Sequence, residues 1–161
     1  VEEKFAQLQF NKLSGANTYT HEISHRMEAI NPKLVSFEAK FFERRTKGSK
    51  PRKLRDATGL NYADHEVYFP LNDAYDGKDW VEYYMGKPYK WDNAMVNSNM
   101  FNQYYNSPEA PEKPKENDYR AFEIFTMGME QLVHGSRTDG KSIHEEDEEM
   151  VAFILGLLAT S

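Results

Sequence analysis

Two histidines and a glutamate in the segment Thr20–Glu28 have the types and the spacing of a metal site. His21 and His25 are four residues apart, so on a helix both imidazoles project from one face, where they can bind the same ion. Glu22 follows His21 directly, and its carboxylate can lie beside that ion without binding it, placed to take a proton from water. The His-Glu-x-x-His pattern therefore predicts a zinc site on a helix, with Glu22 as general base.

A zinc site of this kind needs a third protein ligand and leaves its fourth position for water. One arrangement places a third histidine on the same segment, as His-Glu-x-x-His-x-x-Gly-x-x-His. Here Glu28 stands at the glycine position and Asn31 at the last histidine position, which excludes that arrangement. The other arrangement takes a glutamate from a later helix. Glu28 itself, one turn after His25, either orients an imidazole or is solvated.

The expected helix over residues 119–134 offers two glutamates as the third ligand. Glu123 stands among apolar side chains, where a carboxylate is costly to bury unless it is paired or bound to a metal. Glu130 lies seven residues later on nearly the same face, where it can hydrogen-bond a ligand imidazole. We predict Glu123 as the ligand and keep Glu130 as the alternative. The interpretation of both as solvent-facing glutamates also stays open.

Composition restricts the kind of site and the kind of partner. The 161-residue chain contains no cysteine, so disulfides and thiolate metal sites are excluded, and a metal must be bound by His, Asp or Glu. The formal net charge of −6 argues against general nucleic-acid binding. The length suits one domain with a sizeable core. The remaining histidines, His65, His134 and His144, are scattered and are expected at the surface.

No targeting or membrane segment is expected. No apolar run reaches the length of a transmembrane helix, and the first residues lack the pattern of a signal peptide. We therefore expect no membrane partner and a location in the cytoplasm or in a virion. The sequence begins with Val rather than Met, so residues 1–161 are expected to be a single domain that is a processed product or a piece of a longer protein.

Hydrophobic periodicity predicts three helices at the start of the chain, over about residues 5–15, 17–30 and 31–45. The second carries the two histidines, with Ile23, Met27 and Ile30 as its expected apolar positions. The expected N-terminal signals are Asn17 or Thr18 for the second helix and Asn31 followed by Pro32 for the third.

The middle of the chain has the composition of loops and short strands. Residues 46–55 are basic and contain Gly and Pro, which predicts a solvated loop or, alternatively, an anchor for a partner or an acidic substrate. Residues 62–69 and 80–91 are rich in aromatics and are expected to form short strands or hairpins. Residues 92–117, rich in Asn, Pro and Ser, are expected to form a long loop.

Two helices are predicted at the C-terminal end. The first covers about residues 119–134, with Asp118 as its cap and Phe122, Phe125, Met129 and Leu132 as apolar positions. The second opens with Ser142 and Glu145 in a capping-box pattern and continues to about residue 158. The acidic run at its start is expected to be solvated. The expected fold class is thus α+β, mainly helical, with a small hairpin or sheet region.

Three motifs together resemble the gluzincin metallopeptidases: THEISH with Glu28, the distal FEIFTMGME, and the closing D-x-E-M-x-A-F-I-L-G-x-L. The likeness is to small zincins encoded by phages and prophages and, more distantly, to the catalytic domain of anthrax lethal factor. The motifs cover about residues 17–45 and 119–158. The resemblance implies a zincin-like fold with Zn²⁺ bound by His21, His25 and Glu123, and with Glu22 as general base.

In that family a tyrosine or histidine often stabilises the oxyanion of the tetrahedral intermediate. Tyr119, one helical turn before Glu123 in the predicted helix, is the first candidate, and Tyr84 and Tyr89 are the next. The chain departs from the family in one respect, because only about twenty residues precede His21 and they have a helical pattern. The sheet that aligns a peptide substrate must therefore come from residues 62–91 or from a segment outside this sequence.

These residues predict a zinc-dependent metallopeptidase that hydrolyses peptide bonds with a water molecule activated by Glu22. Its partner would be a protein or peptide substrate. The alternative is a structural or interaction protein of a phage virion, with a zincin-like fold, a structural metal or none, and other virion proteins as partners. The presence of Glu22 favours the enzyme, because a structural site needs no base there.

Overall fold

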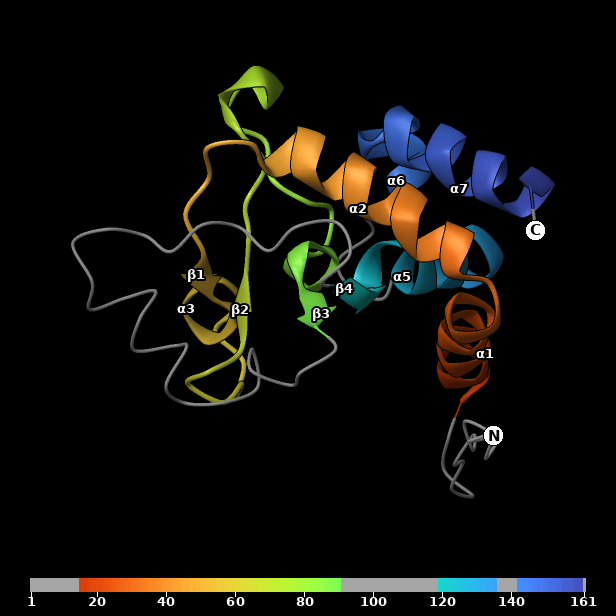
Figure 1. The fold of residues 1–161 in the computed structure, drawn as a ribbon. Helices are drawn as coiled ribbons and strands as arrows, with labels where there is room; N and C mark the ends of the chain where they lie inside the picture. The colour runs from red at the N-terminus through yellow and green to blue at the C-terminus, as the bar shows by residue number, and fades with distance from the viewer. Residues whose placement is uncertain (1–14, 91–118, 136–141, 161) are drawn as a thin grey trace.

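A computed structural model of the chain describes residues 15–90, 119–135 and 142–160 and shows a mainly helical α+β fold (Figure 1). Its helices are α1 (Ala16–Ile30), α2 (Pro32–Thr46), α3 (Leu54–Thr58), α5 (Glu123–His134), α6 (Ile143–Glu146) and α7 (Glu148–Thr160). Its strands are β1 (Arg52–Lys53), β2 (Val67–Tyr68), β3 (Pro88–Lys90) and β4 (Tyr119–Phe122), and two 3-10 helices are η1 (Asp73–Tyr75) and η2 (Tyr83–Gly86). None of the described helices is long and apolar enough to cross a membrane.

Asn31 ends α1 and begins α2, as predicted. Its side chain accepts a hydrogen bond from the backbone N–H of Lys33, and Pro32 occupies the first helical position, where its missing N–H costs nothing. The start of α1 differs from the prediction, because Gly15 is the N-terminal cap and Asn17 already lies inside the helix. The predicted helix before it lies outside the described residues.

The buried face of α1 is polar, and two of its three expected apolar positions, Ile23 and Ile30, are exposed. Ile23 is 49% exposed and Ile30 is 65% exposed, whereas Ser24 and Glu28 are buried. The polar face turns inward because its carboxylate finds partners there: Glu28 accepts a hydrogen bond from the backbone N–H of Phe122 and another from His25. Helix α1 thus packs its histidine face against α5.

The apolar core lies between α2, α5 and the C-terminal helices. Figure 1 shows α7 beside α2, and the rings of Phe41 on α2 and Phe153 on α7 stack with their centroids 4.0 Å apart. Helix α5 contributes Ile124 and Phe125, both fully buried. The burial of these apolar side chains stabilises the position of α5 and therefore of Glu123, its first residue.

The basic segment after α2 is more structured than a solvated loop. Strand β1 pairs antiparallel with β2, Arg52 opposite Tyr68, and the chain then enters α3 with Leu54 fully buried. Residues 62–69 and 80–91 were expected to contain strands and do, in β2 and β3, but these strands do not pair with each other. Strand β2 pairs with β1, and β3 pairs with β4.

The predicted helix over residues 119–134 is instead a strand followed by a helix. Tyr119–Phe122 form β4, which pairs antiparallel with β3, and α5 begins only at Glu123. Phe122 is fully buried with its N–H bonded to Glu28, so the backbone stays extended up to that residue. The expected cap Asp118 and the expected loop 92–117 lie outside the described residues.

The last predicted helix is divided in two at Asp147. Ser142 precedes α6, but its side chain makes no capping hydrogen bond, so the predicted capping box is wrong. Asp147 caps α7 instead, because its Oδ1 accepts from the backbone N–H of Met150 at 3.0 Å. The acidic run is also not uniformly solvated: Asp147 is buried against Arg45, and Glu149 pairs with Arg44.

Candidate metal centre

Three side chains that the sequence singled out lie together between α1 and α5. His21 and His25 stand one turn apart on α1, and Glu123 is the first residue of α5. Nitrogen or oxygen atoms of the three lie within 4.8 Å of one another. Two imidazoles and one carboxylate are a donor set that suits zinc and leaves a fourth position open.

The distances between these donors fit ligands of a single ion better than hydrogen bonds. Glu123 Oε2 lies 3.4 Å from His21 Nε2 and 3.7 Å from His25 Nε2. An N–H···O hydrogen bond spans about 2.7–3.2 Å. Two ligands bound at about 2.0–2.1 Å to a tetrahedral ion lie about 3.3 Å apart. The donor chemistry therefore suits zinc, and the two distances from the Glu123 oxygen to the imidazole nitrogens are compatible with a shared ion.

The other nitrogen of each imidazole faces a buried carboxylate. His25 Nδ1 hydrogen-bonds Glu28 Oε2 at 2.6 Å, and His21 Nδ1 lies 3.5 Å from Glu130 Oε2. Carboxylates in these positions fix the ring and its tautomer, so that Nε2 presents its lone pair to a metal. Glu28 thus orients an imidazole, the first of its two predicted roles, and Glu130 lies beside a ligand rather than in the ligand position.

The Glu123 carboxylate is buried and held by hydrogen bonds at both oxygens. Oε1 accepts from the hydroxyl of Tyr89 at 2.5 Å, and Oε2 accepts from the hydroxyl of Thr126 at 3.1 Å. Burial raises the pKa of Glu123, but the neighbouring His25 and His21 and the Tyr89 hydrogen bond outweigh burial, so the pKa lies below its ordinary value. The group is therefore an anion prepared to bind a cation.

A second buried carboxyl supports the site from α2. Glu38 is fully buried, and its Oε1 accepts from the backbone N–H of Phe125 at 2.8 Å. Burial, and then the adjacent Glu28 carboxylate, raise the pKa of Glu38 well above its ordinary value. The neutral form of Glu38 is therefore favoured, which reduces the repulsion between two buried carboxyl groups side by side.

Tyr89, rather than Tyr119, is the tyrosine that the structure places at the cluster. Its ring meets the His25 ring edge-on at a centroid distance of 6.1 Å, and its hydroxyl reaches Glu123. The helical turn assumed to connect Tyr119 to Glu123 does not exist, because Tyr119 lies in β4; its side chain lies outside the described residues. Burial, and then the Glu123 carboxylate, raise the pKa of Tyr89, so the phenol keeps its proton.

Two further residues, Tyr84 and Lys87, are connected by hydrogen bonds to the Tyr89 hydroxyl. Tyr84 OH lies 3.2 Å from Tyr89 OH, and Lys87 Nζ donates to Tyr84 OH at 2.9 Å. Sequence reasoning named Tyr84 as a candidate but missed Lys87. The pattern Tyr-x-x-Lys-x-Tyr over residues 84–89 was the available signal, and its meaning depends on a 3-10 turn that composition does not predict.

His134 and Glu22 are not among the three donors. His134 is exposed, and its Nε2 lies 2.8 Å from Thr20 Oγ1. Glu22 is half-buried on α1, and among the residues that the structure describes it has neither a hydrogen bond nor an ion pair.

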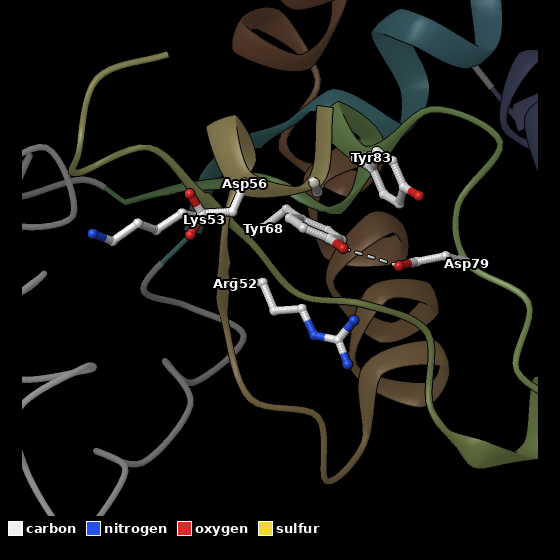
Figure 2. A pocket seen from close by; sticks show the side chains of 7 residues that line it. Arg52, Lys53, Asp56, Tyr68, Asp79 and Tyr83 are labelled. Carbon is white, nitrogen blue, oxygen red and sulfur yellow. Dashed lines mark hydrogen bonds between the residues drawn. The ribbon is translucent and has the colours of Figure 1, made fainter. Parts of the chain in front are cut away.

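A separate pocket lies between β1, α3 and η2. Its volume is about 310 Å³, and Figure 2 shows Tyr68 on its wall donating a hydrogen bond to Asp79. Because the lining combines cations and carboxylates, its charge points to no single ligand class. None of its lining residues is a candidate metal ligand: they are Arg52, Lys53, Asp56, Ala57, Tyr68, Asp79 and Tyr83.

No protein-family model matches this chain, and no match to it was found among curated protein sequences or among solved structures.

Proposed function

We propose that this chain is a zinc-dependent peptidase with a zincin-like arrangement, in which His21, His25 and Glu123 hold the ion. The observation that carries the proposal is the spacing of the three donors, 3.4 and 3.7 Å from the glutamate oxygen to the two imidazole nitrogens. The gluzincin resemblance of the sequence supports the same ligand set. Bound at these residues, zinc lowers the pKa of water toward about 7 and polarises a carbonyl.

Glu22 is the residue that moves the proton. It follows the ligand His21 on α1, and its carboxylate takes a proton from the attacking water and delivers it to the leaving amine. A peptide substrate is the proposed partner because this base and a Lewis-acidic ion together suit amide hydrolysis.

Tyr89 is the proposed donor to the oxyanion that forms on the substrate carbonyl. Its phenol is protonated and half-buried, and it donates a hydrogen bond to the Glu123 carboxylate. Because the phenol carries one proton, donation to the oxyanion requires that proton to turn from Glu123 to the developing negative charge. This assignment replaces Tyr119 as the first candidate.

The test is metal content together with proteolysis. We expect one zinc per chain by elemental analysis, and cleavage of a fluorogenic peptide library that stops on chelation and returns with added zinc. Glu22→Gln should keep the zinc and lower kcat by about 10²–10⁴-fold, because only the base is lost.

The matched control is Glu145→Gln, which makes the same change at an exposed glutamate on α6 and should leave kcat unchanged. Wild-type protein that binds no zinc would exclude the proposal. Zinc binding with no proteolytic activity would instead support a structural metal, as in the virion-protein alternative. Zinc-dependent activity that Glu22→Gln leaves unchanged would show that Glu22 is not the base.

A further inference from the structure

A line of hydrogen bonds runs from Lys87 to the candidate metal ligand Glu123. Lys87 Nζ lies 2.9 Å from Tyr84 OH, Tyr84 OH lies 3.2 Å from Tyr89 OH, and Tyr89 OH lies 2.5 Å from Glu123 Oε1. Tyr84 lies in η2 and Tyr89 in β3, so residues 84–89 supply every member of this line except Glu123.

The chemistry of the end groups sets the direction of every proton in this line. An ammonium can only donate, so the oxygen of Tyr84 accepts from Lys87. A carboxylate can only accept, so Tyr89 gives its proton to Glu123. The one remaining proton, on Tyr84, is therefore directed at the oxygen of Tyr89. All three bonds then point toward Glu123, and each strengthens the next as a donor.

The lysine at the start of the line is itself held in place. Its side chain is only 15% exposed, and Nζ also bonds Glu66 Oε1 at 3.0 Å. The ammonium lies 4.6 Å from the centroid of the Tyr84 ring and 4.9 Å from that of Tyr89, so it contacts the faces of both rings. Tyr62 stacks on Tyr84 from another side. A mobile surface lysine would have none of these constraints.

We propose that Lys87, acting through Tyr84, is a positioning residue of the metal centre, which orients the Tyr89 hydroxyl toward the ligand carboxylate of Glu123. This inference rests on the proposed function for its catalytic consequence. In the described residues, the hydrogen bonds of Lys87 and Tyr84 reach the metal ligands only through Tyr89, and their effect is to hold Tyr89 as a hydrogen-bond donor to Glu123.

The experiment compares Lys87→Met, Tyr84→Phe and the conservative Lys87→Arg. The matched control is Tyr83→Phe, which removes the same atom from the adjacent residue of η2, where the ring lines the separate pocket instead. The first measurement is the downfield hydroxyl proton of the Tyr89–Glu123 hydrogen bond in the NMR spectrum of the metal-free protein, identified by its loss in Tyr89→Phe.

We expect Lys87→Met and Tyr84→Phe to shift or broaden this proton signal, and Lys87→Arg and Tyr83→Phe to keep it. In the zinc-loaded protein the first two variants should lower kcat or zinc affinity by about 10–100-fold, the range for groups that support a ligand, with KM unchanged. Lys87→Arg should recover most of that loss, which a merely structural defect would not allow.

Two outcomes separate this inference from the proposed function. If Glu22→Gln abolishes activity while Tyr84→Phe and Lys87→Met match the wild type in both signal and kcat, the positioning role is wrong and the peptidase stands. If the protein binds no zinc, the peptidase is wrong, and the NMR comparison in the metal-free protein alone decides the role of Lys87. If Lys87→Met does not fold, Tyr84→Phe gives the same decision.

Discussion

The imidazole of His25 lies between two carboxylates, Glu28 on its own helix and Glu123 on α5. Burial lowers the pKa of His25, but the hydrogen-bonding and charge of Glu123 and Glu28 outweigh burial and raise the pKa to about 10 in the metal-free protein. Without an ion, His25 is thus an imidazolium at neutral pH. A metal binding there must displace a proton, so its affinity rises with pH.

The stability of the metal-free protein should therefore fall as the pH rises from about 6.5 to 10. The folded pKa lies above the unfolded value of 6.5, so the stabilisation is complete below the unfolded pKa and is lost as the pH passes through the folded one. Urea unfolding in chelator at a series of pH values measures this slope.

Glu28→Gln should flatten that slope, since it removes one of the two charges that raise the pKa of His25. Glu145→Gln, on the exposed face of α6, is the control and should leave the slope as it is. A slope that is identical in wild type and Glu28→Gln would contradict the assigned role of Glu28.

How far the site could be predicted from the sequence differs from residue to residue. His21 and His25 follow from helical spacing alone, and Glu123 from the cost of burying an unpaired carboxylate. Tyr119 was selected on a helix start at residue 119, whereas α5 begins four residues later at Glu123 and Tyr119 lies in strand β4, so its proposed role stays a prediction. Lys87 could not be predicted, because its partners meet it only through tertiary packing.

The 3-10 helix η2, which carries Tyr84, depends on a glycine at its end. A Cβ built at Gly86 would lie 2.6 Å from the backbone oxygen of Phe69 and 2.7 Å from Nε1 of Trp80. Those two atoms are themselves hydrogen-bonded at 2.7 Å. There is no room for a methyl group unless the backbone moves, because one obstacle is a main-chain atom.

Gly86→Ala should accordingly destabilise the protein by about 1–3 kcal/mol, as overpacking of a well-packed interior does. Displacement of η2 should also move Tyr84 and alter the Tyr89–Glu123 proton signal. The measurement is urea unfolding together with that NMR signal.

The matched glycine is Gly156 in α7, where a Cβ would meet nothing within 4 Å. Gly156→Ala should stabilise the protein by about 0.5–1 kcal/mol, because alanine suits a helix interior better than glycine. If Gly86→Ala stabilised the protein as Gly156→Ala does, the close approach at Gly86 would be unimportant.

At the level of elements, the sequence predicted the long helices better than the strands. Periodic apolar residues mark α2, and Asn31-Pro32 marks its start. The strands are two to four residues long and pair across long sequence separations, so no local pattern specifies them. The inward polar face of α1 was also missed, since it depends on which partners α5 supplies.

The molecule as a whole is joined by a buried arginine at the end of α2. Arg45 is 2% exposed, and its Nη2 lies 2.8 Å from Asp147 Oδ2, at the start of α7. Its guanidinium also lies 4.7 to 5.0 Å from the ring centroids of Phe41, Tyr75 and Trp80. These contacts tie α2, the segment around η1 and the C-terminal helices into one unit.

Arg45→Met should cost about 3–5 kcal/mol of unfolding free energy, because it leaves the Asp147 carboxylate buried without its partner. Adding Asp147→Asn should restore part of the loss, since the amide is neutral and can still cap α7 through Met150. A double-mutant cycle by urea unfolding measures this coupling. Strictly additive effects would contradict it.

The pairing of α1 with α5 also bears on the order in which the chain folds. The two histidines are close in sequence and come together as soon as α1 forms. Glu123 follows them by about a hundred residues, so it reaches them only when the chain between α1 and α5 has brought these two helices together. An ion would thus be held loosely by a nascent helix and tightly only after α5 docks. The rate at which the protein releases its metal would then report how often α5 leaves α1.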